Sequence, residues 1–111
     1  MTQISQTPRV AVITGASAGV GRAVAQQFAA QGWRVGLIAR GRAGLEGARA
    51  DAEAAGTEAL VLPADVADAE AVDKAAQAVV DRWGRIDLWI NAAMATVLAP
   101  VSEVTPTSSA A

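Results

Sequence analysis

The sequence predicts an α/β fold, in which helices cover a parallel sheet, and three observations support this prediction. Short apolar runs, typical of strands that are buried on both faces, recur along the 111 residues. Longer segments with the spacing of an amphipathic helix separate these runs. A glycine follows each longer segment, as is common at the end of a helix. The βαβαβαβ order, with connections too long for hairpins, predicts parallel strands joined by right-handed crossovers.

The apolar runs define the predicted strands. The first two runs are short, continuous and rich in β-branched residues, and Pro63 ends the third run. The fourth run is "IDLWIN". Strands are therefore predicted at residues 10–13, 34–39, 59–62 and 86–91.

The segments between the strands predict three helices, each with one apolar face. Asp68 is placed to cap the third helix, because an aspartate side chain accepts hydrogen bonds from the free N–H groups of a first turn. Gly32, Gly56 and Gly84 are expected to end the three helices. The predicted faces consist of Val20, Val24 and Phe28 in the first helix, Leu45, Ala48, Ala52 and Ala55 in the second, and Val72, Ala76, Val79 and Trp83 in the third.

Composition and charge restrict the classes of function. Hydrophobic residues make up 52% of the chain, enough for a buried core, and the net charge of -2 argues against a nucleic-acid-binding surface. Cysteine and histidine are absent, which excludes thiolate metal sites and removes the commonest metal ligand and general base. No apolar run approaches a membrane span, and the N-terminus lacks the pattern of a signal peptide. We therefore expect a cytoplasmic protein without metal, nucleic-acid or membrane partners.

The stretch "TGASAGVGRA" at residues 14–23 follows the first predicted strand and opens the first predicted helix. A helix N-terminus presents unpaired N–H groups and partial positive charge, so it binds phosphate where the backbone can approach closely. Gly15 would allow a sharp turn, Gly19 would leave room for a pyrophosphate, and Gly21 would let the helix pack tightly. This context indicates a dinucleotide-binding turn. A tight turn without a ligand is the alternative.

Further motifs follow the T-G-x-x-x-G-x-G pattern of this stretch. They are "ADV" at 64–66, "INAAM" at 90–94 and "PVSEVTP" at 100–106. With these motifs in this order, the sequence resembles the short-chain dehydrogenase/reductase family over residues 9–106.

The resemblance implies a Rossmann-like, doubly wound parallel sheet with strand order 3-2-1-4, truncated after the fourth strand. The implied organisation is an N-terminal tail at 1–8, a partial dinucleotide-binding domain at 9–104 and an unstructured tail at 105–111.

The resemblance also assigns roles around a nicotinamide dinucleotide. Thr14 and Ser17 would shape the phosphate loop and form hydrogen bonds in it, and Val20 would lie near the nicotinamide end. The three glycines of the loop, Gly15, Gly19 and Gly21, would cradle the pyrophosphate.

On the adenosine side, Asp65 would meet the adenine amino group through its side chain, and Val66 would contact the ring through its backbone. Asn91 would stabilise the sheet and this side of the pocket. The alternatives are that Asp65 is an ordinary loop carboxylate or turn residue, and that Asn91 is a turn residue at the end of a strand. Ala92 and Met94 depart from the family's N-N-A-G stretch, so Ala92 receives no side-chain role.

The end of the second predicted strand bears on the choice of cofactor, because an acidic residue there binds the ribose 2′-hydroxyl of NAD. Ala39 holds that position and Arg40 follows it, which favours NADP over NAD, with Arg40 pairing the 2′-phosphate. Arg22 and Arg42 are close in sequence and could assist. The alternative is that these arginines are solvated on the surface, and for Arg42 we adopt it.

The resemblance implies hydride transfer between the cofactor and a carbonyl or alcohol, catalysed by a Ser, a Tyr and a Lys. The chain contains no tyrosine, and Lys74 lies on the third predicted helix. We therefore expect no catalytic residue and no activity in this chain, and a small-molecule substrate only in a full-length form. Three interpretations stay open: the cofactor-binding part of a reductase, a complete non-catalytic nucleotide-binding or sensing module, and a structural interaction domain.

The fourth predicted strand would form an edge of the sheet. It is apolar and contains no Lys or Pro, and an exposed edge of this kind invites pairing with another chain. Trp83 and Trp89 would add apolar surface that nothing in the chain obviously buries. We expect this chain to self-associate or aggregate, and a full-length form to be a homo-oligomer.

Overall fold

The computed structural model describes residues 8–92. Some of the predicted features lie outside these residues. They are residues 1–7 of the predicted N-terminal tail, the motif residues after 92, the end of the predicted domain at 104 and the predicted tail at 105–111. The elements follow the predicted βαβαβαβ order. They are β1 (Val10–Thr14), α1 (Gly19–Ala30), β2 (Arg34–Ala39), α2 (Arg42–Ala54), β3 (Ala59–Pro63), α3 (Ala69–Trp83) and β4 (Leu88–Asn91).

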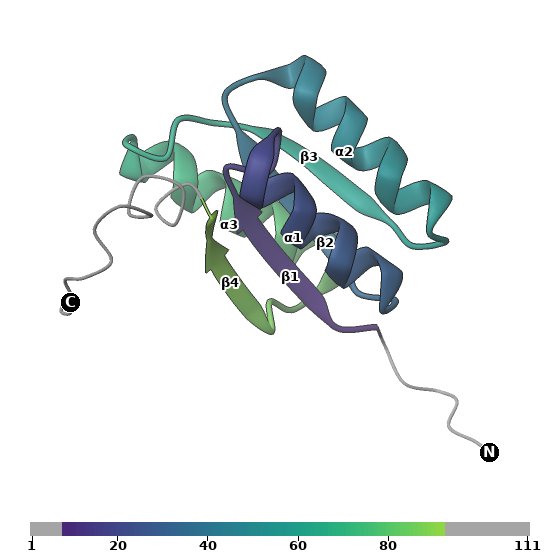
Figure 1. Ribbon diagram of the computed structural model, residues 1–111. Coiled ribbons are helices and arrows are strands. Elements are labelled where there is room, and N and C mark those ends of the chain that lie inside the picture. The colour runs from purple at the N-terminus through teal and green to yellow at the C-terminus, as the bar shows by residue number, and fades with distance from the viewer. Residues whose placement is uncertain (1–7, 93–111) are drawn as a thin grey trace, which may run out of the picture.

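The four strands form one parallel sheet in the order β3-β2-β1-β4, which confirms the predicted strand order. β1 is central: Val12 lies opposite Gly36 of β2 on one side and opposite Trp89 of β4 on the other. Figure 1 shows α1 and α2 side by side on one face of the sheet and α3 on the opposite face. This is the Rossmann-like, doubly wound arrangement that the sequence predicts.

Each face of the sheet has its own apolar core, because successive side chains of a strand point to opposite faces. On the side of α1 and α2, Ala11, Ile13 and Leu37 pack with small residues of the two helices. On the other side, Val12 packs with Val79 of α3. All residues of β1 are buried, so the loop that follows β1 starts from a rigid support.

The buried face of α1 differs from the predicted one. The buried residues of this helix are Gly21, Ala25 and Ala29. Val20 is 46% exposed, while Val24 and Phe28 are only partly buried. The helix approaches the sheet closely, so its smallest side chains, one position further along the chain, occupy the interface.

The predicted faces of α2 and α3 are closer to the structure. Leu45, Ala48 and Ala52 of α2 are buried as expected, but Ala55 is exposed. The buried residues of α3 are Ala75, Val79 and Trp83.

The helix ends agree with the local signals in the sequence. The Asp68 side chain accepts hydrogen bonds from the N–H groups of Glu70 at 3.1 Å and Ala71 at 3.2 Å, which confirms the predicted cap of α3. Gly84 ends α3 in the left-handed conformation with φ 82°. The other two predicted helix-ending glycines also have positive φ.

Several element boundaries differ from the predicted ones. β1 ends at Thr14 and β3 at Pro63, each one residue later than predicted. α2 begins at Arg42, so Gly44 lies inside the helix. β4 begins at Leu88 and not at residue 86. Just before it, Asp87 makes two hydrogen bonds with Val10 at the start of β1: the Asp87 carboxylate accepts from the Val10 N–H at 2.8 Å, and the Asp87 N–H donates to the Val10 carbonyl oxygen at 2.9 Å.

Trp83 is buried, contrary to the expectation from the sequence. Its side chain packs on the α3 side of the sheet and the residue is 9% exposed. The indole N–H donates to Glu58 at 3.3 Å, and the Arg34 guanidinium lies 5.9 Å from the ring centroid. Trp89 is partly buried against the same core.

Within residues 8–92, none of the helices has both the length and the apolar character needed to cross a membrane. The same residues contain no group of His, Asp and Glu side chains that could hold a metal ion.

Candidate functional site

The loop between β1 and α1 has the bare backbone that its sequence suggests. Gly15 has φ 68° and Gly19 has φ 58°, and residues with a Cβ rarely adopt such backbone conformations. A Cβ built at Gly19 would meet nothing within 4 Å, so this position faces open space. A Cβ built at Gly21 would lie 1.9 Å from the Gly15 carbonyl oxygen, so α1 packs directly on the turn before it.

The N-terminus of α1 is suited to an anion. Its N-cap residue, Ala18, makes no side-chain capping bond, and the first turn contains no acidic residue. The unpaired N–H groups and the partial positive charge of a helix N-terminus therefore have no carboxylate of the helix beside them.

A cleft of about 660 Å³ lies beside this loop, where β1, β2 and β3 end. Gly15 and Ser17 of the loop form one side. Arg40 follows β2, and Asp65 and Val66 follow β3. These five predicted site residues are thus brought together from three separate segments of the chain.

The cleft also contains residues that the sequence did not single out as ligand contacts. They are Ala39, Gly41 and Ala64. Each is the last residue of a strand or lies just after one, which is the signal that would have found them.

Arg40 and Asp65 face each other across the cleft. The Arg40 guanidinium lies 3.4 Å from the Asp65 carboxylate, and their side chains are 77% and 46% exposed. A hydrogen bond from the Ala67 N–H and the nearby Arg40 charge lower the pKa of Asp65 below its ordinary value. Asp65 is therefore ionised at neutral pH and can only accept hydrogen bonds.

Thr14 and Asn91 meet at the ends of β1 and β4, outside the lining of the cleft. The buried Thr14 hydroxyl lies 3.3 Å from the Asn91 side-chain oxygen and 3.4 Å from the Ile90 carbonyl oxygen. The Trp89 indole N–H donates to the same Asn91 oxygen at 3.2 Å. Asn91 thus connects the two strands, and its contact with the adenosine side of a cofactor stays a prediction.

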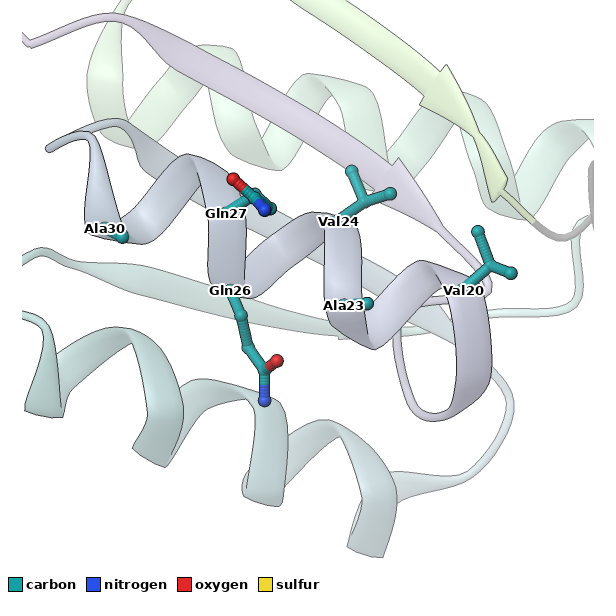
Figure 2. Close-up of a pocket in the computed structure, with 6 residues that line it drawn as sticks. All are labelled: Val20, Ala23, Val24, Gln26, Gln27 and Ala30. Carbon is teal, nitrogen blue, oxygen red and sulfur yellow. The ribbon is translucent and has the colours of Figure 1, made fainter.

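Val20 does not line the cleft. It lies at the end of a separate groove of about 480 Å³ along α1, lined also by Ala23, Val24, Gln26, Gln27 and Ala30. In Figure 2, Val20 and Val24 project from the side of α1 away from α2, whereas Gln26 reaches toward α2. The predicted contact of Val20 with the nicotinamide end is not tested by this arrangement.

Arg22 is bound by a carboxylate of the chain itself. Its Nε donates to Asp51 of α2 at 2.8 Å, and its Nη2 donates to the other oxygen at 3.3 Å. Arg22 does not line the cleft. Asp51 is therefore the anion that compensates the positive charge of Arg22 near the start of α1. The position of Arg22 needs no cofactor phosphate to explain it.

Comparisons with known proteins point to one family. The sequence profile described as short chain dehydrogenase matches residues 9–110. Over 97 residues the chain is 38% identical to the sorbitol dehydrogenase of Cereibacter sphaeroides, an alignment that covers 87% of this chain and 37% of that protein.

Solved structures show the same fold. The L-sorbose reductase of Gluconobacter frateurii, complexed with NADPH and L-sorbose, has a TM-score of 0.70 and 37% identity, over 75% of this chain and 32% of that one. The NAD+-bound xylitol dehydrogenase has a TM-score of 0.71 and 32% identity, over 77% of this chain and 33% of that one.

The chain spans about a third of the length of these relatives. The family match, however, runs through nearly the whole sequence and includes both the glycine loop and the strand ends around the cleft. The chain belongs to the short-chain dehydrogenase family, of which it represents the N-terminal part.

Proposed function

We propose that this chain is the cofactor-binding part of an NADP(H)-dependent oxidoreductase, which transfers hydride between a nicotinamide and a small carbonyl or alcohol. The observation that carries the proposal is the cleft where β1, β2 and β3 end, with the glycine loop on one side and Arg40 and Asp65 beside it. Ligands of open α/β sheets bind outside the carboxyl ends of the strands.

The described residues fit a dinucleotide. The first turn of α1 offers N–H groups without a competing carboxylate, and the open space at Gly19 lets a pyrophosphate approach the backbone. The Ser17 hydroxyl is a further donor on the same side of the cleft. The ionised Asp65 is an acceptor that suits the adenine amino group. A cofactor held in this way would supply the hydride.

The preference for NADP depends on Arg40. No carboxylate stands at Ala39, where one would bind the ribose 2′-hydroxyl of NAD, and Arg40 is among the residues that line the cleft. A guanidinium pairs a phosphate with two parallel hydrogen bonds. The related structures contain NADPH in one case and NAD+ in the other, so the preference is argued from this chain's own residues.

Titration of the chain with NADPH and NADH, followed by calorimetry, tests the proposal. We expect NADPH to bind more tightly than NADH. Adenosine 2′,5′-bisphosphate should compete better than adenosine 5′-monophosphate, because only the bisphosphate carries the phosphate that Arg40 would pair. We expect no oxidation of NADPH with added ketones or aldehydes, because the chain has no tyrosine to act as the acid. A chain that binds neither cofactor would contradict the proposal.

A further inference from the structure

The phosphate loop, residues 15–18, lies between two glycines, one in each helix on this face of the sheet. On the α1 side, a Cβ at Gly21 would lie 1.9 Å from the Gly15 carbonyl oxygen. On the α2 side, a Cβ at Gly44 would lie 2.7 Å from the Ser17 Cβ and 2.8 Å from the Ser17 carbonyl oxygen. Each helix backbone therefore rests directly on the loop.

The conformation of α2 does not call for a glycine at position 44. Gly44 lies in the first turn of the helix, which begins at Arg42, and it is not among the described glycines with positive φ. Alanine has a much higher helix propensity than glycine at such a position. The close approach to Ser17 is thus the physical reason for a glycine here.

The contact between Gly44 and Ser17 joins the two sides of the cleft. Ser17 belongs to the phosphate loop, whereas Arg40 lies just before α2. Near the sheet, the Ala16 N–H donates to the Ile38 carbonyl oxygen at 3.2 Å. Gly44 adds a second contact between the loop and the segment that carries Arg40.

We propose that Gly44 is a positioning residue that sets the spacing between the phosphate loop and Arg40. The inference rests on the proposed function, because it concerns the same cleft. NADPH would place its pyrophosphate at the loop and its 2′-phosphate at Arg40, so its affinity depends on this spacing. Adenosine 2′-monophosphate carries only the phosphate for Arg40, so its affinity does not.

The test compares Gly44→Ala with Gly47→Ala, a matched control in the same helix. The three atoms nearest to a Cβ at Gly47 all belong to the Arg22 guanidinium, the closest at 3.1 Å, and the end of this side chain needs to move by only a few tenths of an ångström. Both substitutions gain the same helix propensity.

We expect Gly44→Ala to weaken NADPH binding by about tenfold or more, because the added methyl group displaces the loop backbone or the first turn of α2. The same variant should bind adenosine 2′-monophosphate within about twofold of the unmodified chain, and Gly47→Ala should bind both ligands within about twofold. Affinities are measured by calorimetry, and thermal unfolding of each variant is followed by circular dichroism.

A second variant, Ser17→Gly combined with Gly44→Ala, removes the Ser17 Cβ, the nearest atom that the new alanine would meet, and leaves the contact with the backbone carbonyl oxygen at position 17. Compared with Ser17→Gly alone, this combination should lose less NADPH affinity than Gly44→Ala loses in the unmodified chain. If Gly44→Ala does not fold but the combination does, that rescue also supports the contact.

Several results would overturn the inference. The first is an equal affinity of Gly44→Ala and Gly47→Ala for NADPH. The second is that Gly44→Ala loses as much affinity for adenosine 2′-monophosphate as for NADPH. The third is that neither Gly44→Ala nor the combined variant folds. Each of these leaves the proposed function intact as long as the unmodified chain binds NADPH. If the unmodified chain binds no NADPH, the proposed function fails, and the positioning role fails with it.

Discussion

Arg40 is the residue on which the proposed choice of cofactor depends. Its side chain is 77% exposed and lies 3.4 Å from the Asp65 carboxylate. An exposed ion pair of this length contributes little, so a 2′-phosphate can replace Asp65 as the partner of the guanidinium. Arg42 lies two residues further on but pairs with Glu46 of the same helix at 3.7 Å and does not line the cleft.

Replacing Arg40 by alanine should weaken NADPH binding by about 1.5–3 kcal/mol, the scale of hydrogen bonds to a charged group. NADH binding should hardly change, because NADH has no 2′-phosphate. Calorimetric titration of both cofactors measures the difference, and Arg42→Ala serves as the control that should leave both affinities unchanged. An equal loss for both cofactors, or no loss at all, would show that Arg40 is only a surface residue.

The residues of the cleft could be predicted from the sequence where they directly follow a predicted strand. Gly15, Arg40 and Asp65 each come within two residues of the end of a strand, and the carboxyl ends of parallel strands meet at one edge of a sheet. The surroundings of Arg22 could not be predicted in this way. Its partner, Asp51, lies 29 residues away on another helix, and no local pattern indicates that pairing.

At the scale of elements, Asp51 of α2 links this helix to α1 through hydrogen bonds. Its carboxylate accepts hydrogen bonds from Arg22 at 2.8 Å and from Gln26 at 3.0 Å, both on α1. The hydrogen bonds from Arg22 and Gln26 lower the pKa of Asp51 below its ordinary value. The ionised carboxylate therefore stabilises the packing of the two helices, and its protonation weakens that packing.

The lowered pKa predicts how the stability contributed by Asp51 varies with pH. A lowered pKa in the folded state means that the contribution is fully present above the ordinary carboxylate pKa of about 3.9 and is lost as pH falls through the lowered value. Asp51→Asn should therefore lower the Tm at pH 7, and this difference from the unmodified chain should shrink as the solution is acidified below about pH 4.

Thermal unfolding from pH 7 down to pH 2, followed by circular dichroism, measures this effect. Asp73→Asn is the control, because Asp73 is an exposed residue of α3. The Tm of this variant should equal that of the unmodified chain at each pH. A Tm difference for Asp51→Asn that stays constant over the whole range would contradict the prediction.

The prediction succeeded at the two ends of α3, whereas the predicted buried face of α1 was wrong. The cap at Asp68 and the stop at Gly84 involve groups only a few residues apart, so the sequence contains all that determines them. The rotation of α1 about its axis depends on how closely the helix approaches the sheet. The structure buries Gly21 and leaves Val20 46% exposed, because a small residue permits the closer contact.

At the scale of the whole molecule, β4 is an edge strand in the described part of the chain. It pairs with β1 on one side, and no other described strand pairs with its second side. Leu88 of β4 is 39% exposed, and Trp89 is only partly buried. We propose that this edge pairs with another copy of the chain, because unpaired strand groups beside apolar side chains favour association.

Replacing Leu88 by lysine should reduce this association, because a charge on an edge strand opposes pairing with a second chain. Size-exclusion chromatography with light scattering should show dimers or larger species for the unmodified chain and a larger share of monomer for Leu88→Lys. Val80→Lys is the control: Val80 is 40% exposed but lies on α3, so this variant should associate like the unmodified chain. A monodisperse monomer for the unmodified chain would contradict the proposal.

The order of the elements, the parallel sheet and the glycine-rich turn after β1 follow from the sequence by itself, because apolar periodicity, capping residues and glycine spacing are all read within short segments. The strand order followed from the family resemblance that those motifs carry. Only the tertiary structure decided that Trp83 is buried, that Arg22 is bound by Asp51 and that Gly44 rests on Ser17. The physical reason is the same in each case: these contacts depend on how closely segments far apart in the sequence approach one another, and packing of the whole domain sets those distances.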